Sequence, residues 1–116
     1  MSAVLELVHA IRPMREGDIA AVLRVERASY EFPWSAGNFH DSIHAGYSAW
    51  VYEVGGEIIG HAVLMAAAGE AHLLNITISP NWRRQGLGRA FLHHMLDTAR
   101  HHQANVLFLE VRPSNA

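Results

Sequence analysis

The chain has 116 residues, of which 50% are hydrophobic and 17% charged, so it is long enough for one packed domain and too short for two. Eleven acidic residues against nine basic ones give a formal charge of −2, which argues against a protein that binds nucleic acid through an overall basic field. The absence of cysteine excludes disulfide bonds and thiolate metal sites. Residues 1–14 lack the basic and apolar segments of a signal peptide or membrane span. We therefore expect a cytoplasmic, monomeric or dimeric protein with one domain, residues 1–116, that binds neither a membrane nor nucleic acid directly.

The first part of the chain is predicted to form one strand and two helices. Residues 5–12 alternate loosely between apolar and polar side chains, which indicates a strand that Pro13 ends. Residues 16–18 open a helix, and Ser35 is expected to cap a second, shorter one. The apolar residues at helical spacing are Ile19, Val22 and Leu23 in the first helix and Phe39 and Ile43 in the second.

The middle of the chain has the composition and turn signals of consecutive strands. Residues 47–54 and 57–67 are predicted strands joined by a Gly55-Gly56 hairpin turn, and residues 71–79 form a third strand after a turn at Gly69. Three antiparallel strands in succession make a meander, with which a doubly wound nucleotide-binding fold would not begin.

A helix and a strand complete the predicted fold. The helix begins at Gly86–Gly88 and ends near Gln103. Residues 106–111 form an almost continuous apolar run, typical of a strand buried on both faces, and Glu110 is its one charge. Because strand, helix and strand follow one another, this strand is expected to run parallel to residues 71–79 through a right-handed crossover. The sequence therefore predicts an α/β fold with a mixed sheet, antiparallel and then parallel, and about three helices.

The most informative stretch is the loop at residues 82–90 (WRRQGLGRA). Two glycines at the start of a helix leave backbone amides unpaired, and these amides, with the positive end of the helix dipole, suit a phosphate or pyrophosphate group. Arg83, Arg84 and Arg89 add local positive charge. The same residues also fit an ordinary glycine turn with surface arginines, so both interpretations stay open at this point.

Two nucleotide-binding motifs fit this loop poorly. A Walker loop requires a lysine, which the chain lacks. The Rossmann fingerprint requires a third small residue where Phe91 stands, although Glu110 falls about where a ribose-binding acid would. A dinucleotide site is therefore the weaker alternative.

Nine histidines include the pairs His93–His94 and His101–His102. A metal site would require ligands that converge from one face and are supported behind. These pairs lie on a predicted helix whose other face is apolar, so we interpret them as solvated surface and predict no metal site.

Together these features resemble the GNAT superfamily of N-acetyltransferases and, within it, the RimI-like enzymes, which acetylate the N-terminal alanine of a small-subunit ribosomal protein. The resemblance covers essentially the whole chain and implies a GNAT fold that transfers an acetyl group from acetyl-CoA to a protein N-terminal amine. The stretches that carry it are residues 31–35 (EFPWS) with Phe39, residues 75–89 (NITISPNWRRQGLGR), and residues 109–112 (LEVR) with 114–116 (SNA).

The resemblance also implies a binding site for acetyl-CoA. Ile76, Thr77 and Ile78 would pair with its pantetheine arm, and a backbone amide there would polarise the thioester carbonyl. Asn115 matches a family position that contacts the cofactor. The glycine loop, with residues 84–89 around the pyrophosphate, consists of Arg83, Arg84, Gln85, Gly86, Leu87, Gly88 and Arg89.

Two further roles are implied by the resemblance. Glu110 matches the family's general base, and Phe32, Pro33 and Trp34 match its acceptor-side loop. Taken without the resemblance, Glu110 is a carboxylate in an apolar strand that must be paired or hydrated, and the aromatic loop is a core-packing turn. With no cysteine as a nucleophile, the transfer is expected to be direct.

RimI-like chains continue past residue 116 with a helix that carries a tyrosine general acid and with two more strands. We therefore expect a C-terminally incomplete domain whose last strand forms an apolar sheet edge. Tyr30, Tyr47 and Tyr52 lie at non-matching positions, so none is assigned as the general acid. Two other functions stay open: a GNAT enzyme that acetylates a small-molecule amine, and a non-catalytic acyl-CoA-binding module.

Overall fold

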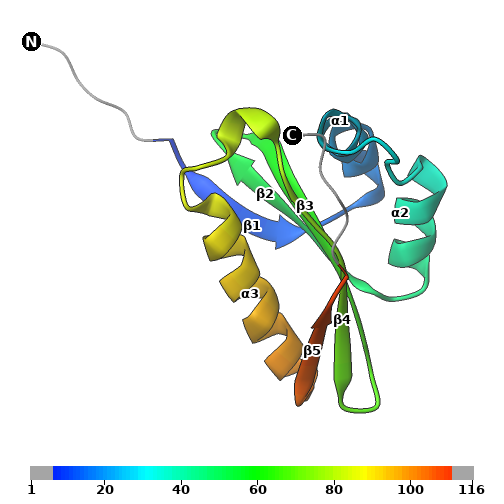
Figure 1. Ribbon diagram of the computed structural model, residues 1–116. Helices are drawn as coiled ribbons and strands as arrows, with labels where there is room; N and C mark the ends of the chain where they lie inside the picture. Colours follow the sequence, from blue (N-terminus) through cyan, green and yellow to red (C-terminus); the bar gives the residue numbers. More distant parts are fainter. Residues whose placement is uncertain (1–6, 111–116) are drawn as a thin grey trace, which may run out of the picture.

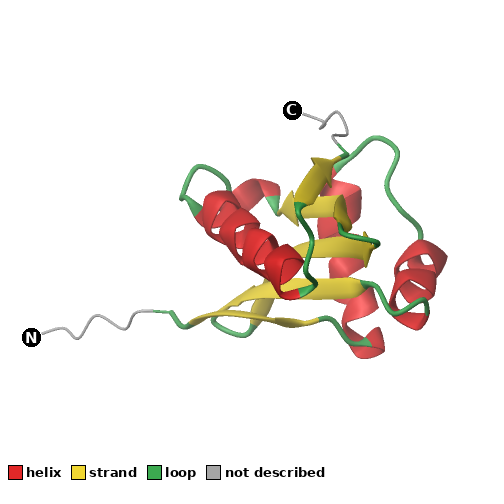
Figure 2. Ribbon diagram, turned by 90° about the horizontal axis from the view of Figure 1, so that it is seen from below, coloured by secondary structure: helices red, strands yellow, loops and turns green. Residues whose placement is uncertain are grey.

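The computed structural model describes residues 7–110 and contains a five-stranded sheet with helices on both faces (Figure 1; Figure 2). The strands lie side by side in chain order; β1 to β4 are antiparallel to their neighbours, and β5 is parallel to β4. The predicted α/β class, the meander and the parallel crossover strand are thus confirmed. The strands are β1 (His9–Pro13), β2 (Ser48–Val54), β3 (Glu57–Ala67), β4 (Glu70–Ile78) and β5 (Val106–Leu109).

The helices divide between the two faces of the sheet. α1 and α2 pack on one face, and α3, which connects β4 to β5, packs on the other (Figure 1). None of the helices within residues 7–110 has the length and apolar content that a bilayer span requires. The α-helices are α1 (Ile19–Ser29), α2 (Ala36–His44) and α3 (Leu87–His101), and two short 3-10 helices are η1 (Glu16–Asp18) and η2 (Pro80–Trp82).

The alternation of side chains along the strands gives the domain two apolar cores. Val63 of β3 packs with Val22 and Phe39 under α1 and α2, whereas its neighbours Ala62 and Leu64 belong to the core under α3. Successive strand residues point to opposite faces, so one strand supplies both cores.

Local signals explain most of the element boundaries. Ser35 caps α2 as predicted: its hydroxyl accepts the Asn38 amide at 3.1 Å, and the Asn38 side chain accepts the Ser35 amide at 2.9 Å. The first strand begins at His9, later than predicted, and residues 5 and 6 lie outside the described residues. Pro13 belongs to this strand, where an edge position tolerates its missing N–H.

β5 forms an apolar edge of the sheet, as expected. Val106, Phe108 and Leu109 are 48%, 45% and 54% exposed. The run therefore lacks the burial on both faces that its composition suggests. Within residues 7–110 it also has a neighbouring strand only on the β4 side. Val111, the last residue of the predicted strand, lies outside the described residues.

Candidate active site

β4 and β5 diverge halfway along β4. The two strands pair only as far as Leu73 and Leu109, after which the Glu110 amide donates to the Leu73 carbonyl at 3.2 Å. β4 continues to Ile78, and within residues 7–110 no other strand occupies this edge of it (Figure 1). A groove of about 280 Å³ lies at the divergence. Its lining consists of Tyr30, Leu73, Asn75, Ile76, Thr77, Ile78, Gly88, Leu92, Leu109 and Glu110.

This groove is lined from both faces of the sheet. Tyr30 follows α1 on one face, whereas Gly88 and Leu92 belong to α3 on the other. The edge of a strand presents backbone N–H and C=O groups that require partners. An extended ligand that contains amide groups can therefore pair with residues 74–78 as a further strand would.

A left-handed turn begins α3 beside the groove. Gly86 has a φ of +79°, which glycine adopts without strain, and Arg84 has a φ of +64°. The Ala90 amide makes the first backbone hydrogen bond of the helix, to the Gly86 carbonyl at 3.1 Å. The amides of residues 87–89 precede that bond and are therefore available to an anion at the positive end of the helix.

The predicted anion-binding loop is tied directly to the groove. The Arg83 Nε donates to the Ile78 carbonyl at 3.1 Å, and Gly88 lines the groove itself. Leu87 is buried in the core beneath α3, so only its backbone can contact a ligand. The exposed members of the loop, whose side chains can reach a ligand, are Arg84, Gln85 and Arg89.

Gly60 of β3 allows β3 and β4 to approach closely beside the groove. A Cβ atom at this position would lie 2.7 Å from the Thr77 carbonyl oxygen and 2.8 Å from Ile78 Cδ1. Both distances are well below van der Waals contact, so a side chain would force the two strands apart.

Glu110 lies in the wall of the groove but not within the strand. β5 ends at Leu109, and Glu110 is exposed. The expectation of a carboxylate inside an apolar strand is therefore wrong, because the pairing with β4 ends one residue earlier. The groove nevertheless brings Glu110 together with residues 76–78, the predicted pantetheine site. Asn115, the remaining predicted cofactor residue, lies outside the described residues.

A buried polar network lies on the α1 face of the sheet. The Glu26 carboxylate accepts the Asn75 side-chain amide at 3.1 Å, lies 2.8 Å from His61 Nε2, and accepts the Trp34 backbone amide at 2.9 Å. Asn75 in turn accepts the Thr77 hydroxyl at 2.7 Å. Glu26 and His61 are fully buried, and such groups are stable in a protein interior only when hydrogen bonds replace their hydration.

Tyr30 connects this network to the groove, a role that the sequence analysis missed. Its hydroxyl lies 2.9 Å from Thr77 Oγ1 and 3.3 Å from the Ile76 carbonyl oxygen, and its side chain lines the groove. The hydroxyl therefore holds the exposed edge of β4 from the α1 side.

Two signals in the sequence point to the network. Glu26 follows Val22 by four residues, which places a carboxylate on the apolar face of the predicted helix. Asn75 and Thr77 are two residues apart in a strand, so both polar side chains lie on one face of it.

The predicted acceptor-side loop lies outside the groove lining. Trp34 packs against Phe39 with their ring centroids 5.1 Å apart, so the core-packing interpretation is right for this residue. Phe32 is 81% exposed, and Pro33 is also exposed.

The histidine pairs at residues 93–94 and 101–102 are not all exposed. His93 and the His101–His102 pair are exposed, as predicted. His94 instead packs edge-on against Trp50 with the ring centroids 4.4 Å apart, and its Nε2 is buried. This burial lowers the pKa of His94 from its ordinary value.

Comparison with known proteins identifies the family to which this fold and groove belong. Residues 19–116 match the family described as the acetyltransferase (GNAT) family. The chain belongs to this family.

Individual relatives agree with this assignment. The ribosomal protein bS18 alanine N-acetyltransferase of Escherichia coli strain K12 is 33% identical over 109 residues, which are 94% of this chain and 74% of that protein. The crystal structure of the ribosomal protein S18 alanine N-acetyltransferase from Escherichia coli superposes with a TM-score of 0.84, over 94% of this chain and 70% of that chain, at 33% identity. A GNAT acetyltransferase from Brucella melitensis, crystallised with acetyl-CoA, shares the fold at 20% identity, with a TM-score of 0.76 over 91% of this GNAT chain and 77% of that one.

Proposed function

We propose that the chain transfers the acetyl group of acetyl-CoA to the amine of a protein N-terminus, and that its acceptor is the N-terminal alanine of a small-subunit ribosomal protein, in the cytoplasm. The observation that carries the proposal is the groove at the divergence of β4 and β5, which joins the helix amides of α3 at Gly88 and has Glu110 in its wall. The choice of acceptor is supported by the names of relatives with 33% identity.

The chemistry of the groove supports acetyl-CoA as the ligand that would bind there. A pyrophosphate fits the first amides of α3, where the dipole and Arg84, Gln85 and Arg89 favour negative charge. The pantetheine arm contains two amides and would pair with backbone groups of residues 76–78, at the edge of β4 that no other strand within residues 7–110 occupies. Arg83 supports this arrangement through its bond to the Ile78 carbonyl.

The reaction then requires one proton acceptor. The neutral amine attacks the thioester carbonyl, a C–N bond forms, the C–S bond breaks, and coenzyme A leaves as a thiolate. A backbone amide of residues 76–78 stabilises the oxyanion. Glu110 takes the proton that the amine loses, directly or through a water molecule.

The acceptor is proposed to approach from the α1 face. Tyr30 lines the groove on this face, and the segment after it presents Phe32 as an exposed apolar side chain for a peptide. The bond between the Trp34 amide and Glu26 keeps this segment attached to the network that supports β4.

The test is the kinetics of coenzyme A release from acetyl-CoA. An alanine-starting peptide of the ribosomal protein is compared with a panel of polyamines and aminoglycosides. We expect turnover with the peptide alone. Turnover only with the small amines would contradict the acceptor, and thermal stabilisation by acetyl-CoA with no release in any assay would indicate a binding module.

A variant then tests the proposed base. Glu110→Gln should lower turnover by ~10²–10⁴-fold and leave the affinity for acetyl-CoA unchanged, since general base catalysis acts on the amine and not on the cofactor. Glu57→Gln, an exposed carboxylate at the start of β3, is the matched control. Equal turnover of Glu110→Gln and the control would remove Glu110 from the mechanism.

A further inference from the structure

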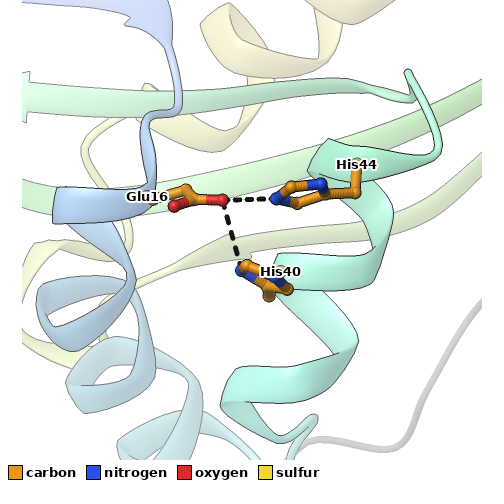
Figure 3. A group of neighbouring side chains, drawn as sticks. All are labelled: Glu16, His40 and His44. Carbon is orange, nitrogen blue, oxygen red and sulfur yellow. Dashed lines mark hydrogen bonds and ion pairs between the residues drawn. The ribbon is translucent and has the colours of Figure 1, made fainter.

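Three side chains that no part of the proposed reaction uses converge on the surface beside α2. Glu16 lies in η1, before α1, and His40 and His44 are one helical turn apart on α2. Figure 3 shows both imidazole rings directed at the same carboxylate oxygen. None of the three lines the groove between β4 and β5.

The donor atoms of this cluster are already close together. Glu16 Oε1 lies 2.6 Å from His44 Nε2 and 3.3 Å from His40 Nδ1, and the three donor atoms all lie within 4.8 Å of one another. The two rings are 4.2 Å apart between centroids. Histidines at positions i and i+4 share one face of a helix, so α2 holds both rings on the side that faces Glu16.

We propose that Glu16, His40 and His44 form a binding site for a divalent transition-metal ion of the Zn²⁺ type, with water as a further ligand. Two imidazole nitrogens and one carboxylate oxygen are donors that Zn²⁺ prefers, whereas Mg²⁺ and Ca²⁺ prefer oxygen donors alone. In tetrahedral coordination two such donors lie roughly 3.3–3.4 Å apart, so shifts of about 1 Å or less convert the present arrangement into a coordination sphere. The side chains are 49–62% exposed, which leaves them free to make these shifts and open to an ion from solvent.

Binding at this site has a structural consequence. The ion would cross-link η1 to α2. The chain between these two points, which contains α1 and the segment that connects it to α2, would then form a loop closed by the metal. Because the ligands converge only in the folded chain, binding stabilises the fold in proportion to the metal concentration. The site is independent of acetyl transfer, and it can be tested without an activity assay.

The experiment uses the untagged full chain after treatment with a chelator. Co²⁺ is titrated and followed by its visible absorption, Zn²⁺ is used to displace it, and Tm is measured with each ion and with Mg²⁺. We expect one Co²⁺ per chain, displacement by Zn²⁺, a rise in Tm with Co²⁺ or Zn²⁺ that the chelator reverses, and no rise with Mg²⁺.

Variants distinguish this site from other histidines. The double change His40→Ala and His44→Ala should weaken Co²⁺ binding at least about tenfold, and Glu16→Gln should weaken it too, while both keep the circular dichroism of the parent. The matched control is His101→Ala with His102→Ala, another exposed pair, which should bind as the parent does. No saturable binding by the parent, or equal binding by the His40/His44 double variant, would overturn the proposal. An equal stabilisation by Mg²⁺ would overturn the assignment to transition metals.

Discussion

Glu26 supports two parts of the candidate site at once. Its carboxylate binds Asn75 on β4 and the backbone of Trp34 in the segment between α1 and α2. A fully buried carboxylate is costly to move, because any shift leaves hydrogen-bonding groups without partners. The wall of the groove and the proposed acceptor segment therefore share one rigid support.

Removal of the Tyr30 hydroxyl should affect ligand binding more than folding. Tyr30→Phe loses the hydrogen bonds to Thr77 and to the Ile76 carbonyl, which costs about 0.5–1.5 kcal/mol of stability per bond. Because those bonds fix the edge of β4 that lines the groove, we expect the dissociation constant of acetyl-CoA to rise several-fold, measured by calorimetry. Tyr47→Phe, which is remote from the groove lining, is the control. Unchanged affinity in Tyr30→Phe would show that the edge needs no support from α1.

His94 should make stability depend on pH. Burial lowers its pKa in the folded state, so the unfolded chain binds the proton more readily. Neutral His94 therefore contributes to the free energy of unfolding. This contribution is fully present above the ordinary histidine pKa of 6.5 and is lost as pH falls from 6.5 through the folded-state pKa. We expect urea denaturation to show that the free energy of unfolding falls less across this pH interval for His94→Leu than for the parent. The control is His93→Leu, at the exposed neighbouring position. The prediction is contradicted if the free energy of unfolding of His94→Leu depends on pH as that of the parent does.

At the scale of elements, the start of α3 depends on one backbone conformation. Gly86→Ala places a side chain at a φ of +79°, which costs about 1–2 kcal/mol. The amides of residues 87–89 would be reoriented, so we expect weaker binding of acetyl-CoA, measured by the ligand-induced rise in Tm. Gly37→Ala adds the same methyl group within α2, in ordinary contact with Ser35 Oγ, and should leave binding unchanged. If acetyl-CoA raised the Tm of Gly86→Ala as much as that of the parent, these amides would not hold the pyrophosphate.

The elements themselves were predictable where the signal is local. The capping pair of Ser35 and Asn38 and the hairpin at Gly55-Gly56 act within a few residues, so helix and strand boundaries there follow from the sequence. The exposure of Glu110 was not predictable, because it depends on where β5 stops pairing with another strand.

At the scale of the molecule, the site depends on contacts between distant residues. Tyr30 reaches Thr77 and Glu26 reaches Asn75 across more than forty positions of sequence, and no local pattern specifies such a pair. The resemblance to GNAT enzymes indicated which loop and strands form the groove. Which polar groups pair on the α1 face, and which side chains form the cluster around Glu16, depends on how the sheet places the helices beside one another.

The absence of a side chain at Gly60 has a consequence for the whole sheet. The residue belongs to β3 and does not line the groove, yet it determines how near β3 lies to Thr77 and Ile78. Gly60→Ala should push that part of β4 outward, cost about 1–3 kcal/mol by overpacking, and reduce acetyl-CoA affinity measured by calorimetry. Gly17→Ala, where the added methyl group meets open space, is the control, and normal affinity in Gly60→Ala would contradict the coupling. The width of the proposed cofactor groove therefore depends on a residue of the neighbouring strand, and selection for altered affinity can act at Gly60 while every side chain that lines the groove stays the same.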